Sequence, residues 1–232
     1  MRKYKCLFGL IYSICQILFI PLFGQNDISY YNAFVHNQPA KWKESLDGNL
    51  ARNDKITDLQ YLYGYIGWCI RENMKEEGKI YLQKMESLLD DTTLSEFNHN
   101  LYKSIALSYG VLLGVRNPMI NGPKILKYSE RALKADPTSA MAHIQKGNTF
   151  LNMPAVFGGS RKKAIVWFQK AQKLLEEKGN ISQNWLYLHL LCSISETYEA
   201  EGEKKLADAY YKKILLLEPD FFWLKRNKGF SE

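Results

Sequence analysis

Apolar residues follow the helical period along almost the whole chain after residue 24. They recur at spacings of three and four, and no sustained run alternates apolar with polar residues as a half-buried strand would. The pattern predicts an all-α protein of about five antiparallel helix pairs. The predicted pairs span residues 27–36 with 40–52, 57–73 with 75–89, 94–115 with 123–135, 138–151 with 160–177, and 181–201 with 203–217.

Proline, glycine and asparagine mark the breaks between these helices. Pro39 suits the first turn of a helix, and Gly202 suits the turn inside the last pair. The break in the third pair contains two turn signals, one around Pro118 and one ending at Pro123. We therefore expect the second helix of that pair to begin at Pro123.

Small and aromatic residues occupy fixed positions in the later pairs. In the last pair, Ser195, Tyr198, Ala207, Tyr211 and Pro219 have the relative spacing of a repeated helix–turn–helix unit. A small residue at a helix crossing lets the two axes approach to about 8–10 Å. The aromatic side chains then fill the space beside the crossing.

The fourth pair has the same pattern with an insertion. Gly147, Phe150, Ala164, Phe168 and Ala171 match the unit. Gly147 and Ala164 are 17 residues apart, where the unit has about 12, and the extra residues are 154–158. The third pair matches well in its second helix, and the second pair matches poorly.

On these matches the chain resembles the tetratricopeptide repeat family over residues 57–220. The resemblance implies a right-handed α-solenoid, a tetratricopeptide-like superhelix whose first helices line a concave surface. That surface would bind a protein or peptide partner. The expected organisation is a signal peptide at 1–24, an N-terminal helix pair at 25–56, the repeat domain at 57–220 and a capping tail at 221–232.

The inserted loop carries a second resemblance. It runs from Pro154 through Phe157 to Gly158 and Gly159, directly before a helix that contains several alanines. This loop is similar to one in the T-component proteins associated with TRAP transporters, which are periplasmic. The similarity implies an alternative function, in which the protein binds a small molecule as an accessory of an envelope transport system.

The first 24 residues resemble an export signal. Arg2, Lys3 and Lys5 precede an uncharged apolar run from Cys6 to Phe23, and Gly24 provides a small residue before a cleavage site. The ending before Gln25 is similar to leader ends in Bacteroidetes. We therefore expect a periplasmic mature protein that begins at Gln25. The alternative is an uncleaved anchor, because the run is at the lower limit for spanning a bilayer.

The mature chain offers few groups for chemistry. Loss of the leader lowers the formal charge from +7 to +4, a weak excess that gives no support to nucleic-acid binding. The four histidines stand alone, without the spacing of a zinc site, and Gly-x-Ser-x-Gly is absent. We expect no cofactor, no metal and no enzymatic activity, and we expect Cys69 and Cys192 to be buried free thiols.

Candidate partner contacts come from the register that the resemblance implies. Core packing and plain solvent exposure remain open as alternatives for each of them. Phe157 has two interpretations of its own: it seals the core, or it closes one end of the groove and contacts the partner. The other candidates on the concave side are Met141, Ile144, Asn148, Leu151, His189, Cys192, Glu196 and Glu199.

Export gives the first testable prediction. N-terminal sequencing of the protein purified from its native host should begin at or near Gln25, because the charged start, the apolar run and Gly24 form a cleavable leader. An intact Met1 terminus in a membrane fraction would favour the uncleaved anchor instead.

Overall fold

A computed structural model describes residues 25–49, 54–90 and 92–223. Within these ranges every regular element is helical and no strand occurs, which confirms the all-α class. The leader lies outside the described residues. The helices are α2 (Gln25–Val35), α3 (Pro39–Asn49), α4 (Lys55–Arg71), α5 (Lys75–Leu89), α6 (Glu96–Leu112), α7 (Pro118–Ala135), α8 (Ala140–Asn152), the short 3-10 helix η1 (Ala155–Phe157), α9 (Arg161–Glu177), α10 (Trp185–Ala200) and α11 (Lys204–Leu217).

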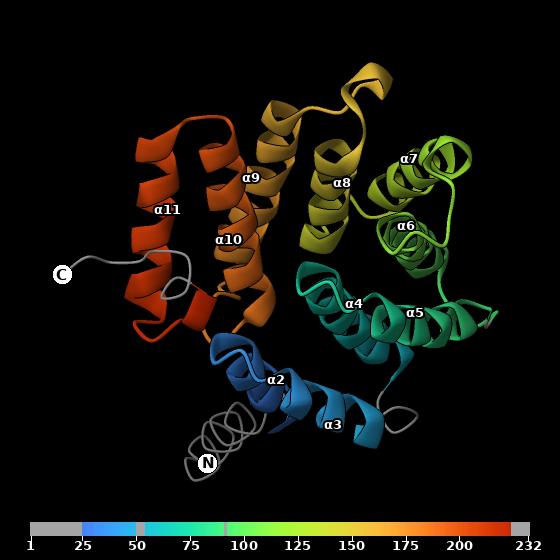
Figure 1. The fold of residues 1–232 in the computed structure, drawn as a ribbon, viewed down its shortest axis with the longest axis horizontal. Coiled ribbons are helices and arrows are strands. Elements are labelled where there is room, and N and C mark those ends of the chain that lie inside the picture. Colours follow the sequence, from blue (N-terminus) through green and yellow to red (C-terminus); the bar gives the residue numbers. More distant parts are fainter. Residues whose placement is uncertain (1–24, 50–53, 91, 224–232) are drawn as a thin grey trace, which may run out of the picture.

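Consecutive helices form pairs that follow one another around a common centre (Figure 1). The pairs are α2 with α3, α4 with α5, α6 with α7, α8 with α9, and α10 with α11. The first helices α4, α6 and α8 are neighbours in that order, and α10 returns to contact α2. We call the side of α4, α6, α8 and α10 that faces this centre the inner side.

Polar residues fix where most of these helices begin. The carboxylate of Asp54 accepts hydrogen bonds from two backbone N–H groups at the start of α4. At the starts of α6, α8 and α9 a serine hydroxyl accepts one such bond, and these serines are Ser95, Ser139 and Ser160. Such caps satisfy backbone donors that have no partner inside the helix.

Small residues lie where the two helices of a pair cross. Ser195 in α10 donates to the carbonyl of Ala207 in α11 at 2.9 Å, and Ser104 in α6 donates to the carbonyl of Ile125 in α7 at 3.0 Å. In α8, a Cβ on Gly147 would lie 2.4 Å from the Phe168 ring of α9. The residue types in the repeat pattern therefore permit the close approach of the paired helices.

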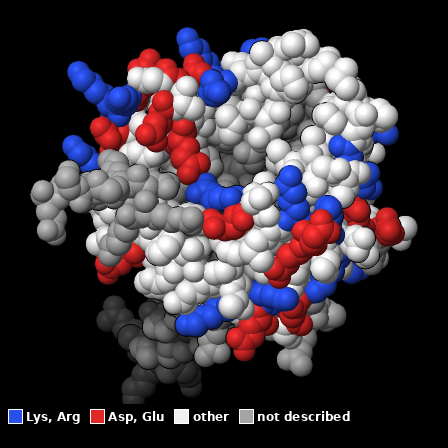
Figure 2. All heavy atoms as spheres, viewed as in Figure 1, with Lys and Arg blue, Asp and Glu red and all other residues white. Residues whose placement is uncertain are grey.

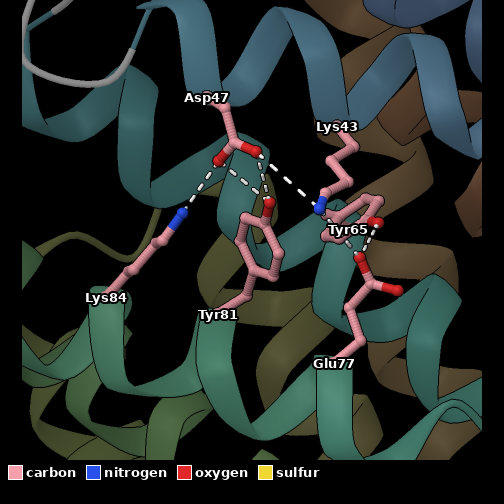
Figure 3. A network of polar contacts seen from close by, with 6 residues as sticks. All are labelled: Lys43, Asp47, Tyr65, Glu77, Tyr81 and Lys84. Carbon is pink, nitrogen blue, oxygen red and sulfur yellow. Dashed lines mark hydrogen bonds and ion pairs between the residues drawn. The ribbon is translucent and has the colours of Figure 1, made fainter.

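A polar network fastens the first pair to the second (Figure 3). Tyr81 in α5 donates to both carboxylate oxygens of Asp47 in α3, at 2.9 and 2.7 Å, and Lys84 donates to one of them at 2.8 Å. Burial opposes ionisation of Asp47, but the hydrogen bonds from Lys84 and Tyr81 outweigh it and lower its pKa. Lys43 in α3 lies 3.4 Å from Glu77 in α5.

The last described residues pack against the first described helix. Phe221 and Trp223 are buried. The Phe221 ring lies 5.6 Å from that of Phe34 in α2, and Tyr31 in α2 donates a hydrogen bond to Glu218. The segment after α11 therefore packs on the first helix pair.

The observed boundaries differ from the predicted ones mainly at two helix starts. The prediction that α7 begins at Pro123 is wrong, because Pro118 occupies the first turn and Asn117 caps it. Pro123 lies inside this helix, where it costs a single backbone hydrogen bond. The last pair begins at Trp185 rather than at residue 181, because Gln183 has a φ of 50° and Asn184 caps the helix.

Packing at the α8–α9 crossing gives the second testable prediction. Ala164→Leu or Ala171→Leu should lower the free energy of unfolding by about 1–3 kcal/mol, because both alanines are fully buried. Lys173→Leu on the same helix is the control, since the Lys173 side chain is 76% exposed. Equal melting temperatures for the alanine and lysine variants would contradict this packing.

Candidate functional site

Aromatic side chains fill the space at the inner side of the first helices. The Tyr63 ring of α4 stacks on that of Tyr109 of α6 at 5.8 Å, and it lies 6.3 Å from the Trp185 ring of α10. The first pair contributes Trp42, whose ring meets Trp185 edge-on at 5.0 Å, and Phe34, 6.1 Å from Trp185. We call these residues the aromatic cluster.

A small cavity of about 40 Å³ remains beside this cluster. His189 and Cys192 of α10 and Arg71 of α4 line it. Arg71 spans the gap between the two helices and bonds both carboxylate oxygens of Glu196, at 3.0 and 3.1 Å. Its guanidinium lies 4.9 Å from the Trp223 ring centre. The cavity has room for one or two water molecules and is too small for a bulky side chain.

Burial controls the titration of the two reactive groups in this cavity. It lowers the pKa of His189 to about 4, and the nearby charge of Arg71 acts in the same direction. Burial also raises the pKa of Cys192 to about 12. The histidine is therefore neutral and the thiol is protonated near pH 7, so this thiol is a poor nucleophile. Cys69 and Cys192 are buried and free, as predicted.

A larger pocket lies elsewhere, between α6, α7, α8 and η1. Its volume is about 300 Å³, at the lower end of the range for ligand pockets. Figure 2 shows few charged residues on the face where α7, α8 and η1 lie in Figure 1. We call this cavity the apolar pocket, and its main apolar lining consists of Leu112, Met119, Pro123, Leu126, Met153 and Phe157.

The sequence of the inserted loop shapes one wall of the apolar pocket. Gly158 has a φ of 91°, which permits the sharp turn after η1. A Cβ on Gly159 would lie 1.7 Å from the carbonyl oxygen of Met153, so only glycine fits there. These two glycines turn the chain back into α9 and leave the Phe157 side chain 49% exposed at the pocket.

Polar groups in the apolar pocket are uncharged and hydrogen-bonded within the protein. Ser108 donates to the carbonyl of Ser104 at 2.9 Å, and Thr149 donates to the carbonyl of Gln145 at 2.8 Å. Asn152 donates to the carbonyl of Asn148 at 2.9 Å. Such a lining favours an apolar group over a charged one, because burying a charge without a partner is costly.

The predicted contact residues do not form one surface. Asn148 and Phe157 both line the apolar pocket, whereas His189 and Cys192 line the small cavity. Ile144 is 1% exposed, so it offers no surface to a partner in this conformation. The remaining candidates pack against the core or bond to other residues of the chain, and they are Met141, Leu151, Glu196 and Glu199.

The exposure of Phe157 bears on its two interpretations. The residue is 49% exposed and is not among the buried core residues, which favours contact with a partner over sealing of the core. Contact with a partner remains a prediction for Phe157, as it does for the other candidates apart from the buried Ile144.

Sequence analysis missed the contribution of α7 to the pocket. Met119 and Ile120 are 61% and 62% exposed, and Met119, Gly122 and Pro123 line the cavity. The sequence did contain an indication, because two bulky apolar residues, Met119 and Ile120, lie between the two turn motifs. The turn motifs predict only a loop for this segment and therefore give these side chains no role.

Comparison with known proteins gives no further guide to function, because no family model and no curated protein matches this chain. Among the described residues, no group of three or more His, Cys, Asp and Glu side chains is placed to hold a metal ion. No helix within the described ranges has the length and apolar character needed to cross a membrane.

The buried imidazole gives the third testable prediction. Between pH 6.5 and about 4 the unfolded chain binds a proton at His189 that the folded protein does not. The free energy of unfolding should therefore fall as the pH drops through this window, by on the order of 1–3 kcal/mol from this residue. Above pH 7 the titration of His189 should not change it.

Chemical denaturation across this pH range measures the effect. His189→Gln should remove that part of the pH dependence, because glutamine does not titrate. His36→Gln, at an exposed position, is the matched control and should keep the wild-type slope. Identical slopes for wild type and His189→Gln would show that His189 is not held neutral in the fold.

Proposed function

We propose that this is a non-catalytic binding protein that captures a protein or peptide partner by taking a bulky apolar side chain into the apolar pocket. One observation carries the proposal: a 300 Å³ apolar cavity opens beside several large apolar side chains that are left in solvent. Exposed apolar surface around a pocket is typical of interaction sites. The proposed partner site lies outside the inner side, where the aromatic cluster occupies the space.

Exposed residues beyond the cavity favour a macromolecular partner. Val115 is 50% exposed, Ile120 62% and Val156 84%, and each is next to or near lining residues in the sequence. A small molecule enclosed in the cavity would leave all three in water. A protein or peptide could cover them while one large side chain fills the pocket, as anchor residues do in many interfaces.

The chemistry of the pocket supports binding rather than catalysis. A reaction centre needs a base, a nucleophile, a metal or a group that stabilises charge, held together in one place. Ser108, Thr149 and Asn152 already donate to backbone carbonyls of their own helices. Cys192 is protonated and lies in the other cavity.

We further propose that the helix pairs form a right-handed, tetratricopeptide-like solenoid and that the protein acts in the periplasm. Support for the solenoid comes from the neighbouring first helices and from small residues such as Gly147 and Ser195 at the pair crossings. Support for export comes from the leader pattern in residues 1–24.

A second candidate function is the binding of a small apolar molecule for an envelope transport system. The volume of the apolar pocket and its lack of charged lining residues favour this alternative. The two functions differ in what should remain bound to the purified protein, a polypeptide or an extractable apolar compound.

The fourth testable prediction tests the pocket by filling it. Gly122 lines the cavity, and a Cβ there meets no atom within 4 Å. Gly122→Leu should therefore fold normally, with added helix propensity in α7, and should block entry of a partner side chain. Gly48→Leu is the matched control, because its Cβ also meets nothing within 4 Å and it lies in α3.

Affinity capture from the native envelope, followed by mass spectrometry, compares the three proteins. A polypeptide retained by wild type and Gly48→Leu but lost with Gly122→Leu would support the proposal. An apolar compound with the same dependence, in organic extracts, would favour the second function. If neither depends on Gly122, the apolar pocket is not the binding site.

Phe157→Ala provides an independent check at the pocket wall. It should change the free energy of unfolding by less than about 1 kcal/mol, because the ring is half exposed, while partner capture falls. Phe168→Ala, at a fully buried ring, should cost about 3–5 kcal/mol. A comparable loss of stability in both variants would assign Phe157 to the core.

A further inference from the structure

The sequence stretches that form the apolar pocket contain basic residues but no acidic ones. Every lining residue falls within 97–129 or 137–175, two stretches that contain no Asp or Glu. Together these stretches hold ten Lys and Arg residues. The rest of the chain after residue 24 holds eighteen Lys and Arg against all twenty-four Asp and Glu. The basic excess of the mature protein is therefore concentrated in the part that forms the pocket.

Several of these basic residues have no acidic partner among the residues that the structure describes. Arg116 pairs with Glu86 and Lys146 with Glu130. By contrast, Lys124 and Lys127 are exposed on α7 and make no ion pair with the described residues. Each follows a pocket-lining residue, Pro123 in one case and Leu126 in the other, so both lie within a helical turn of the cavity wall.

A third exposed lysine follows the inserted loop that forms one wall of the pocket. Lys162 is exposed in the first turn of α9 and makes no ion pair with the described residues. The glycine turn after Phe157 leads directly into this helix, and Ser160 N donates to the carbonyl of Phe150 at the end of α8. Exposed lysines are therefore adjacent in sequence to lining residues of α7, and another occurs where the loop wall continues into α9.

We infer that the partner is an acidic polypeptide segment in which Asp or Glu residues flank a bulky apolar anchor. The inference rests on the proposed function and adds the charge of the partner to it. The uncharged cavity accepts the anchor, while the unpaired lysines attract flanking carboxylates across water, within the range of about 8–10 Å over which exposed charges act. Such attraction sets partner choice and the association rate more than it sets affinity.

Selection of random peptides displayed on phage tests both the apolar anchor and the acidic flanking residues. The mature protein, residues 25–232, is the target, and Gly122→Leu is used to remove peptides that bind elsewhere. The expected product is a set of peptides with a bulky apolar residue flanked by Asp or Glu. Their binding to wild type, measured with synthetic fluorescent peptides, should weaken several-fold as salt rises.

Charge reversal then tests whether the lysines act locally. The double variant Lys124→Glu/Lys127→Glu should weaken a selected peptide by about tenfold or more. Lys205→Glu/Lys212→Glu changes the net charge equally at exposed positions of α11 and should have little effect. Equal losses in the two double variants would overturn the assignment to the pocket. Circular dichroism confirms that each variant is folded.

The outcomes separate the two proposals. Pocket-dependent peptides with apolar anchors and no preference for acidic flanks would overturn the inference and leave the proposed function standing. Failure to select any pocket-dependent peptide would contradict both. Vesicles of phosphatidylcholine with phosphatidylglycerol provide the last arm. Binding to them that requires Phe157 and the two α7 lysines, without peptide binding, would replace the acidic segment with a membrane surface.

Discussion

The aromatic cluster holds the first and last helix pairs together around the centre of the molecule. Tyr63, Tyr109 and Trp185 come from three different first helices, and Phe34 and Trp42 from the first pair pack onto them. Aromatic side chains bury large areas, and edge-on or offset contacts add about 0.5–1.5 kcal/mol per pair. Because the rings belong to helices far apart in sequence, packing them requires α10 to return to α2. The inner side thereby becomes part of the core.

Aromatic packing allows neighbouring helices to meet through more than one pair of faces. Polar contacts select which faces meet. Asp47 receives hydrogen bonds from Tyr81 and Lys84, and Arg71 bridges α4 to Glu196 of α10. Partly exposed pairs of this kind add little to stability. They do impose direction, because a donor in one helix must lie opposite an acceptor in another. We regard them as contacts that fix the register of the closing pairs.

The side chains of α6, α7 and α8 leave part of the space between these helices unfilled, and this space is the apolar pocket. Pro118 and Pro123 lie in the first turns of α7, and the insertion ends in Gly158 and Gly159, which turn sharply back to α9. The direction of the backbone at these prolines and glycines leaves Phe157 beside the apolar pocket. An exposed phenylalanine is unfavourable for a protein alone in water. Coverage by a partner would recover that free energy, which is the physical basis of the proposed function.

The sequence by itself determined the helical class, most helix boundaries and the small residues at the crossings, because these depend on local periodicity, capping and turn chemistry. It predicted Lys75–Leu89 without error and predicted the start of the helix after the glycine turn to within one residue. It did not reveal that α7 begins at Pro118, since a proline can open a helix as readily as a turn. Tertiary structure alone decided that His189 lies beside aromatic rings, that Ile144 is buried and that Met119 and Phe157 share a cavity. These positions depend on contacts between residues tens to more than a hundred positions apart, and the spacing of residues within a helix carries no information about them.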